Sequence, residues 1–308
     1  MFPAFLTTIF WSISTFCAHR STKIFGGTEA NFWRLTLATT FLSIYAFSFG
    51  QGLTTTAFPF FFLSGIVGIG FGDLALFQTI PRLGPRLTLL IVQCLTAPFA
   101  AAIEWLWLGA RLSPAEIGCA AAVLLGIGIS LAPNQHLNIP RSRLIPGMLF
   151  GMAAALGGAI GAVLSRKAYL LIQQSHEIVD GATASFQRLT GGLLIGAVVL
   201  LMVKAKTIRS SLLAAKPDRA IPASDRWRRA GPWILANALA GQTFGVICYQ
   251  KAFQSTRTGI VLPIVAMTPL MAMPISRWFD QEKISWHAIV GGVIAVAGVV
   301  SLALMAAR

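Results

Sequence analysis

The sequence predicts an all-α membrane protein of ten transmembrane helices, built as two inverted repeats of five helices each. Three observations lead to this prediction: the composition, the succession of apolar runs, and the repetition of short motifs. Of the 308 residues, 56% are hydrophobic and only 11% are charged, and the mean hydropathy is +0.73. A soluble domain carries about a quarter charged residues. Too little polar surface is therefore available to cover a globule in water, and lipid is expected to surround most of the outside.

Apolar runs of the length that crosses a bilayer follow one another along the whole chain. A spanning helix needs about 20 mostly apolar residues, whereas the strands of a membrane barrel show segments of about ten residues with alternating polarity. The sequence contains no such alternation, so helices are expected. The ten predicted spans are residues 2–17, 32–50, 58–80, 87–109, 114–132, 144–164, 188–203, 233–253, 259–279 and 286–304.

Two connections between these runs are longer than the others. Residues 165–187 carry charges of both signs, and residues 204–231 are strongly basic, with eight Lys and Arg residues. We interpret the basic segment as a solvated cytoplasmic loop; a surface-lying helix that touches anionic lipid is the alternative. Cytoplasmic loops of membrane proteins collect positive charge, and most Lys and Arg residues follow odd-numbered runs. Both termini are therefore expected on the non-cytoplasmic side of a bacterial-type inner membrane.

Short motifs recur in the same order in the two halves of the chain, which is the mark of an internal repeat. FWRLT at 32–36 matches FQRLT at 186–190, and FGDLALFQ at 71–78 matches FGVICYQ at 244–250. Each copy contains five spans, and an odd number means that the second copy enters the bilayer from the opposite side. Carriers that work by alternating access use this arrangement. The predicted division is a first repeat at 1–135, a linker at 136–143 and a second repeat at 144–308.

Several classes of function are disfavoured by the residue pattern. The net charge of +14 lies mainly between apolar runs, so nucleic acid is not an expected partner. The four cysteines are far apart and form no C-x-x-C pair, which gives neither a disulfide framework nor a metal site. No G-x-x-x-x-G-K-[ST] loop is present, so an ATP-driven pump is not expected. The four histidines are scattered, and we expect no enzyme activity and no cofactor.

Charged residues inside apolar runs are the first candidates for function, because a charge at the bilayer centre is costly unless it is paired, protonated or wetted. Asp73 lies well inside the third run, where it could couple transport to protons, contact a cationic group, or pair structurally with a residue such as Arg34. Glu104 lies nearer a run's end, where a satisfied interfacial group is the main interpretation and a coupling site the alternative. Arg34 and Arg188 are equivalent in the repeats. They either reach the lipid headgroups or bind an anionic group of the solute.

Polar and aromatic side chains inside the runs are the second group of candidates. They either line a central cavity as solute ligands or form hydrogen bonds between helices, the commoner role. The correspondence of Gln78 with Gln250 favours a shared inward direction. Trp11 could line a cavity, whereas Trp33 is interpreted as an interfacial anchor. The remaining members of the group are Gln93, Gln242 and Tyr249.

Prolines inside the fourth and ninth runs form a third group. Proline lacks a backbone N–H and kinks a helix, although prolines are tolerated in spanning helices generally. Such kinks can shape a binding site or a gate. The candidates for this role are Pro98, Pro263 and Pro269.

Taken together, these motifs resemble the EamA-type carriers of the drug/metabolite transporter superfamily. The resemblance rests on the two five-span repeats, the Arg that heads the second span of each half, and the proline-containing fourth spans followed by a G-E-R-L-S-like turn. It covers nearly the whole chain. The acidic residue of that turn is Glu282 in the second half but Ala110 in the first, so a carboxylate is not required in both. Family members more often keep their termini cytoplasmic, which differs from the charge distribution here.

The expected function is secondary transport of a small metabolite, amino-acid-like or otherwise polar or amphipathic, across the inner membrane. The resemblance implies export rather than import. Expected partners are the solute, membrane lipid and a proton or other coupling ion; a homodimer is compatible with the sequence. A membrane-embedded lipid-modifying enzyme and a non-transporting membrane scaffold are the alternatives.

Overall fold

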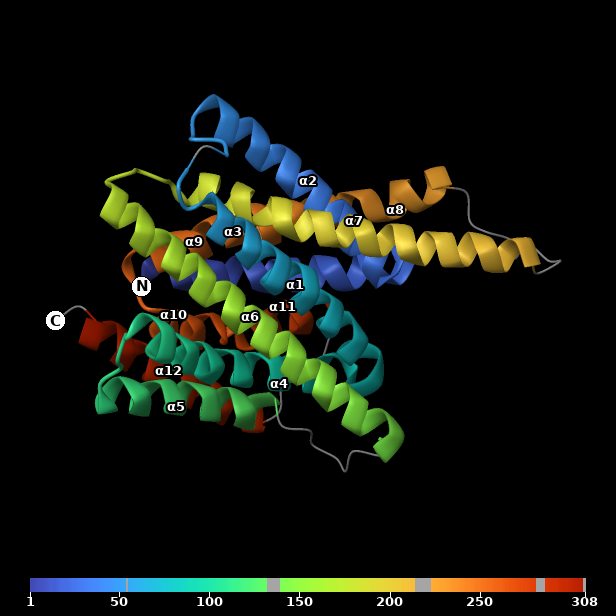
Figure 1. Ribbon diagram of the computed structural model, residues 1–308. Helices are drawn as coiled ribbons and strands as arrows, with labels where there is room; N and C mark the ends of the chain where they lie inside the picture. Colours follow the sequence, from blue (N-terminus) through green and yellow to red (C-terminus); the bar gives the residue numbers. More distant parts are fainter. Residues whose placement is uncertain (54, 132–138, 214–222, 281–285, 307–308) are drawn as a thin grey trace.

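The computed structural model describes residues 1–53, 55–131, 139–213, 223–280 and 286–306, and every regular element within these ranges is a helix (Figure 1). Two of the elements, η1 and η2, are π-helical. In chain order the helices are α1 (Phe2–Phe25), α2 (Gly27–Ser48), α3 (Phe58–Ser64), η1 (Gly65–Phe71), α4 (Gly72–Leu108), α5 (Pro114–Leu131), α6 (Arg141–Ser175), α7 (Gly181–Leu213), α8 (Ala223–Asn237), η2 (Ala238–Gly245), α9 (Val246–Ser255), α10 (Thr258–Val265), α11 (Thr268–Asp280) and α12 (Trp286–Ala306).

Within the described residues, six helical stretches are long and apolar enough to cross a bilayer, which makes the chain a multi-pass membrane protein. The other predicted runs also lie in helices. Polar residues such as Arg34 lower the hydropathy of α2, and the apolar stretch Thr258–Pro274 is shorter than the six. Many apolar side chains on these helices face outward, as expected where lipid is the solvent. The six stretches are Phe58–Ile80, Leu87–Leu108, Pro114–Leu131, Arg141–Ser175, Gly181–Val203 and Trp286–Met305.

The two long connections predicted from sequence are largely helical. Helix α6 continues to Ser175 and α7 begins at Gly181, so only residues 176–180 connect them instead of 165–187. Asp180 explains the start of α7, because its carboxylate accepts hydrogen bonds from the backbone N–H groups of Ala182 and Thr183 at 2.8 and 3.0 Å. The predicted basic loop is likewise replaced by the end of α7, up to Leu213, and by α8; residues 214–222 lie outside the described part of the chain.

Helix α4 is not one straight rod, because the chain reverses its direction within it. A Cβ atom added at Gly151 of α6 would lie 3.4 Å from Thr79 Cγ2 and 3.0 Å from Ile91 Cγ2. Twelve residues of a straight helix span about 18 Å, so both contacts require the chain to turn back between them. The sequence between these residues contains Pro81 and Pro85. The third and fourth predicted spans are therefore two antiparallel arms, and the teal ribbon in Figure 1 turns back accordingly.

The second helix of each half packs against the other in an antiparallel direction. Phe47, near the end of α2, contacts Phe186, near the start of α7, with ring centroids 5.4 Å apart. At the other end of the contact, a Cβ atom on Gly196 of α7 would lie 3.5 Å from Leu35 of α2. Figure 1 shows the two helices side by side. Helices α2 and α7 therefore begin at opposite ends of the bundle, and Arg34 and Arg188 each lie near one of these starts.

A G-x-x-x-G motif occurs at each π-helix: Gly68 lies in η1 and Gly72 is the next residue after it, at the start of α4, whereas Gly241 and Gly245 both lie in η2. Glycine permits a close approach of neighbouring helices. A Cβ atom on Gly161 of α6 would lie 2.9 Å from Gly68 Cα. The sequence repeat is therefore matched by a repeated and uncommon backbone geometry.

The ninth predicted span is broken between α10 and α11. Proline at 269 cannot donate the backbone hydrogen bond that would continue the helix, and the Thr268 hydroxyl instead donates to Val265 O at 2.6 Å. Two hydroxyls of α1 support the carbonyls on either side: Thr8 donates to Ile264 O at 3.2 Å, and Ser12 donates to Thr268 O at 2.8 Å. The break is therefore a stable, hydrogen-bonded feature of the fold.

Candidate functional site

A cavity of about 170 Å³ lies at the centre of the bundle, where helices from both halves of the chain meet. The first half supplies α1, η1 and both arms of α4, and the second half supplies α6, α7, η2, α9 and α10. Most of its wall is apolar, and the polar side chains come from few positions. Its lining includes Trp11, Gly68, Asp73, Gln93, Gly158, Arg188, Gln242, Val246 and Tyr249.

On one side of the cavity, Asp73 forms an ion pair with Arg34. The Nη2 atom of Arg34 lies 3.0 Å from Asp73 Oδ2, and Arg34 Nε donates to Asn31 Oδ1 at 2.7 Å. Both charged side chains are about four-fifths shielded from solvent. Arg34 therefore does not need to reach the headgroups, and of the roles expected for Asp73 the structure contains the pairing with Arg34.

On the opposite side, Arg188 is enclosed by aromatic side chains. Only 5% of Arg188 is exposed, and its guanidinium carbon lies 5.4 Å from the ring centroid of Tyr249. Tyr249 in turn packs between Trp11 and Phe253, with centroid distances of 5.0 and 4.4 Å. The Nε atom of Arg188 is buried and has no partner among the described residues. Such a cation can interact with charge inside the cavity.

Gly68 provides the space in which the Arg188 guanidinium lies. A Cβ atom at position 68 would be 3.0 Å from Arg188 Nη2. Trp11 is fixed beside Tyr249 in the lining of the same cavity, because its indole N–H donates to Gly241 O at 3.2 Å. The glycines of both repeated motifs therefore shape this site.

The four glutamines named from the sequence lie in different places. Gln93 and Gln242 line the cavity, and the side-chain oxygen of Gln242 is buried without a partner in the described structure. Gln250 is fully buried but lies outside the cavity lining. Gln78 is exposed and accepts a hydrogen bond from Arg82 Nη1 at 2.9 Å. The expected shared inward direction of Gln78 and Gln250 is therefore wrong, because Gln78 lies near the turn within α4.

Glu104 is a buried structural group away from the cavity. Its Oε2 atom accepts hydrogen bonds from the Thr258 hydroxyl at 2.5 Å and from Gly259 N at 3.2 Å. A carboxylate that accepts from these first residues of α10 neutralises the positive end of that helix. Its other oxygen lies 4.0 Å from Arg166 Nε. The main interpretation of Glu104, a satisfied group, agrees with these contacts.

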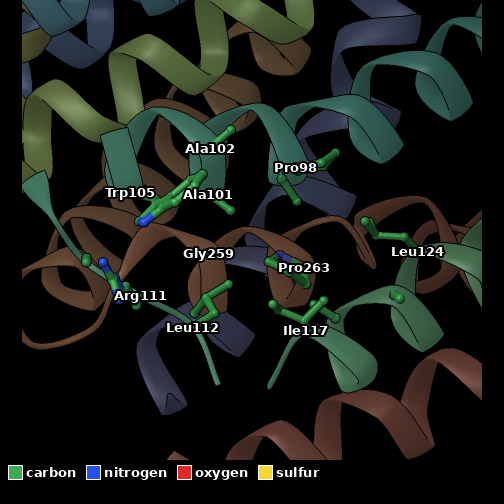
Figure 2. Close-up of a pocket in the computed structure, with 14 residues that line it drawn as sticks. Pro98, Ala101, Ala102, Trp105, Arg111, Leu112, Ile117, Leu124, Gly259 and Pro263 are labelled. Carbon is green, nitrogen blue, oxygen red and sulfur yellow. The ribbon is translucent and has the colours of Figure 1, made fainter. Parts of the chain in front are cut away.

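Trp33 and two of the three candidate prolines also lie away from the central cavity. Trp33 packs on Trp227 of α8, with ring centroids 5.0 Å apart. Pro98 and Pro263 line a different cavity of about 630 Å³ between α4, α5 and α10 (Figure 2). That larger cavity opens on the outer surface, since Pro98, Trp105 and Ile117 are exposed. Its lining is mainly apolar, and the side chains with polar atoms in it are Arg111 and the indole of Trp105.

The geometry thus singles out a small central cavity with an ion pair on one side and an enclosed arginine on the other. The sequence model of the EamA-like transporter family matches residues 1–132 and 145–304. The chain belongs to the EamA-like transporter family. Its expected membership of the drug/metabolite transporter superfamily is confirmed.

One similar solved structure is described only as "Crystal structure of protein". It is 15% identical in sequence, with a TM-score of 0.74, and the match covers 100% of this chain and 97% of the other. At this identity the likeness concerns the fold. No curated protein sequence matches the chain.

Two further points concern the acidic residue of the second turn and the binding of metal ions. Glu282, the acidic residue of the second G-E-R-L-S-like turn, lies outside the described residues. Among the described residues, no group of three or more His, Cys, Asp and Glu side chains could hold a metal ion. The polar chemistry of this EamA-like transporter that the structure describes at the cavity is therefore that of arginine, carboxylate, amide and aromatic groups.

Proposed function

We propose that this chain is a secondary transporter that moves a small metabolite by alternating access, with the central cavity as its solute site. The proposal is supported by the position of the cavity between the halves, because both halves contribute to its wall. A solute held there is released when one half rocks against the other. Membership of the EamA-like transporter family supports the same class of function.

The proposal includes an inverted relation between two five-helix halves. It is supported by the antiparallel contact of α2 with α7 and by the equivalent π-helices η1 and η2. In Figure 1, α1 begins and α12 ends at the same end of the bundle, as an even number of crossings requires. Two halves of opposite orientation can open to either side by nearly the same motion.

The membrane and the orientation are part of the proposal. We place the chain in a bacterial-type inner membrane with both termini outside the cytoplasm, and we propose export as the direction. The support for the orientation is the basic segment from Lys204 to Arg229, since positive charge favours the cytoplasmic face. A reporter fused after Arg308 that is active only outside the cytoplasm is the expected result. Activity only in the cytoplasm contradicts this orientation.

An uptake screen with the full chain in reconstituted vesicles tests the transport function. Small metabolites are added with and without an imposed proton gradient, and the wild type is compared with two glycine-to-phenylalanine variants. Gly158→Phe fills the cavity, because its Cβ atom would lie 3.5 Å from Thr96 inside the lining. Gly118→Phe is the matched control, because no atom lies within 4 Å of its Cβ position on α5.

Uptake by the wild type and by Gly118→Phe, with loss in Gly158→Phe, is the expected result. Equal uptake by wild type and Gly158→Phe contradicts the central cavity as the route. Uptake of no metabolite by the wild type, in either direction across the vesicle membrane, contradicts the transport function itself.

A further inference from the structure

The two arginines that are equivalent in the repeats have different partners. In the first half, Arg34 has Asn31 at its Nε atom and Asp73 at its Nη2 atom. The repeat aligns FWRLT with FQRLT and FGD with FGV, so the corresponding positions around Arg188 are Ser185 and Val246. The Ser185 hydroxyl donates to Gly181 O at 2.6 Å within its own helix. Arg188 therefore lacks both of the acceptors that satisfy Arg34.

This difference leaves one positive charge in excess at the cavity. Arg34 and Asp73 neutralise each other, whereas Arg188 has no ion pair with a carboxylate in the described part of the chain. Arginine cannot release its proton in a protein, and an uncompensated buried charge is strongly unfavourable. The Tyr249 ring, which is neutral, and the Asp73 carboxylate, which is already paired with Arg34, compensate this charge only in part. A site of this kind is stabilised by an anion that arrives from outside.

We propose that Arg188 is the anion-binding subsite of the central cavity and that the solute is a small monocarboxylate. This inference rests on the proposed transport function and names the substrate class of the same site. One excess positive charge matches one negative charge. The planar guanidinium donates well to a carboxylate, and its buried Nε atom is a donor in need of an acceptor.

The size and wall of the cavity define the rest of the solute. A volume of about 170 Å³ is below the roughly 300–1,000 Å³ of pockets for drug-sized ligands, so the solute has few heavy atoms. Leu76, Val92 and Leu262 form an apolar wall that suits a short hydrocarbon body. The unpartnered oxygen of Gln242 can accept a hydrogen bond from a hydroxyl or an amine on the solute. All solutes of the proposed class share a carboxylate and an apolar body. They differ in the hydrogen-bond donor, a hydroxyl or an amine, that lies near the carboxylate.

Binding to the purified full chain in lipid nanodiscs tests the inference, with four five-carbon probes of similar size. Pentanoate carries the carboxylate alone, 2-hydroxypentanoate and norvaline add a hydroxyl and an amine, and pentanamide is the neutral counterpart. We expect the wild type to bind at least one of the three carboxylates and to bind pentanamide at least about 30-fold more weakly, as for loss of a buried charge pair. The ranking of the three carboxylates identifies the group that faces Gln242.

The decisive variant is Val246→Asp, which gives Arg188 the carboxylate that Arg34 already has. This substitution is expected to keep the protein folded, as judged by its thermal midpoint, and to weaken carboxylate binding by about 30-fold or more. Arg188→Gln is expected to lose binding as well. Arg111→Gln is the control, because Arg111 lies at the edge of the outer cavity and is exposed; its binding is expected to equal that of the wild type.

Equal binding of carboxylate and amide, or undiminished binding by folded Val246→Asp, overturns the subsite. Absence of binding by all three carboxylates also overturns the subsite. It does not decide the transport function, which the uptake experiment with Gly158→Phe tests separately. Conversely, carboxylate binding that is lost in Val246→Asp, without transport of any solute, supports the subsite while the transport function fails.

Discussion

The π-helices η1 and η2 carry the same glycine motif in the two halves, yet different neighbours enclose them. η1 lies against the backbones of α6 and α7: a Cβ atom on Gly65 would overlap the carbonyl oxygen of Arg188, and one on Gly161 of α6 would lie 2.9 Å from Gly68 Cα. η2 lies against side chains of α1, where Ser14 and Trp11 occupy the space beside Gly241 and Gly245. The repeat therefore preserves the backbone geometry, while the side chains around it have diverged and decide what each half can bind.

The largest expected effect follows from the backbone contact of η1. Gly65→Ala is expected to lower the free energy of unfolding by about 3 kcal/mol, because a backbone carbonyl cannot move aside as a side chain can. The repeat-equivalent residue is already Ala238, and Ala238→Gly is expected to cost only about 1 kcal/mol, the helix penalty of glycine. Unfolding in mixed detergent micelles measures both values. Equal effects would show that the halves do not differ at this position.

A smaller effect is expected from the ion pair of the first half. Asp73→Asn leaves Arg34 without its charged partner beside a second buried arginine, and we expect a loss of about 2 kcal/mol in stability. This value is reduced from that of a fully buried pair because both side chains are partly exposed. Because the carboxylate is already paired with Arg34, we expect the dependence of uptake on an imposed proton gradient to persist. Loss of that dependence would assign Asp73 to proton coupling.

The side-chain contact of η2 is expected to give a third, more modest effect. Gly241→Ala displaces the Ser14 hydroxyl, which donates to Asn237 Oδ1 at 2.6 Å, and the loss of one hydrogen bond costs about 1 kcal/mol. The double variant Gly241→Ala, Ser14→Gly removes the collision and should recover part of the loss, as a double-mutant cycle would measure. No coupling between the two positions would contradict the contact.

The smallest effects concern Gln78 and Gln250, the two glutamines that end the matching motifs and that lie one residue apart in the register that aligns Asp73 with Val246. Gln78→Ala is expected to change stability by less than about 0.5 kcal/mol, since the side chain is exposed. Gln250→Leu is expected to raise stability by about 0.5 kcal/mol, because both polar atoms of Gln250 are buried without partners in the described structure. Thermal unfolding of the two variants compares them. A similar loss of stability in both would restore the equivalence that the sequence suggested.

Hydropathy predicts those helices well whose outer faces contact lipid. The predicted spans 58–80, 87–109 and 114–132 agree with the apolar stretches of the structure to within one residue at each end. It predicts poorly the start of α7, where Thr183, Ser185 and Gln187 are fully buried. Their polar groups are satisfied by other parts of the protein; the amide of Gln187, for example, donates to Gly52 O at 2.8 Å. Such residues resemble a loop in sequence although they lie inside a helix.

The candidate site was predicted in part. Trp11, Asp73, Arg188 and Tyr249 were selected as polar or aromatic residues in apolar runs, and the structure brings them to one cavity. The same rule also selected Glu104, whose partners at the start of α10 are far away in sequence. Which role a buried polar residue has depends on whether a partner reaches it, and a single sequence does not contain that information.

The amino-acid sequence by itself determined that lipid surrounds this protein and that its elements are helices, because composition and periodicity are local properties. It also contains short motifs that recur in the same order in its two halves. Only the tertiary structure decided that Arg34 has a carboxylate at 3.0 Å, whereas the equivalent Arg188 forms no ion pair with any carboxylate of the described residues. The physical reason is that the energy of a buried charge depends on all groups within a few ångströms of it. In a helical bundle those groups come from helices that are far apart in the chain.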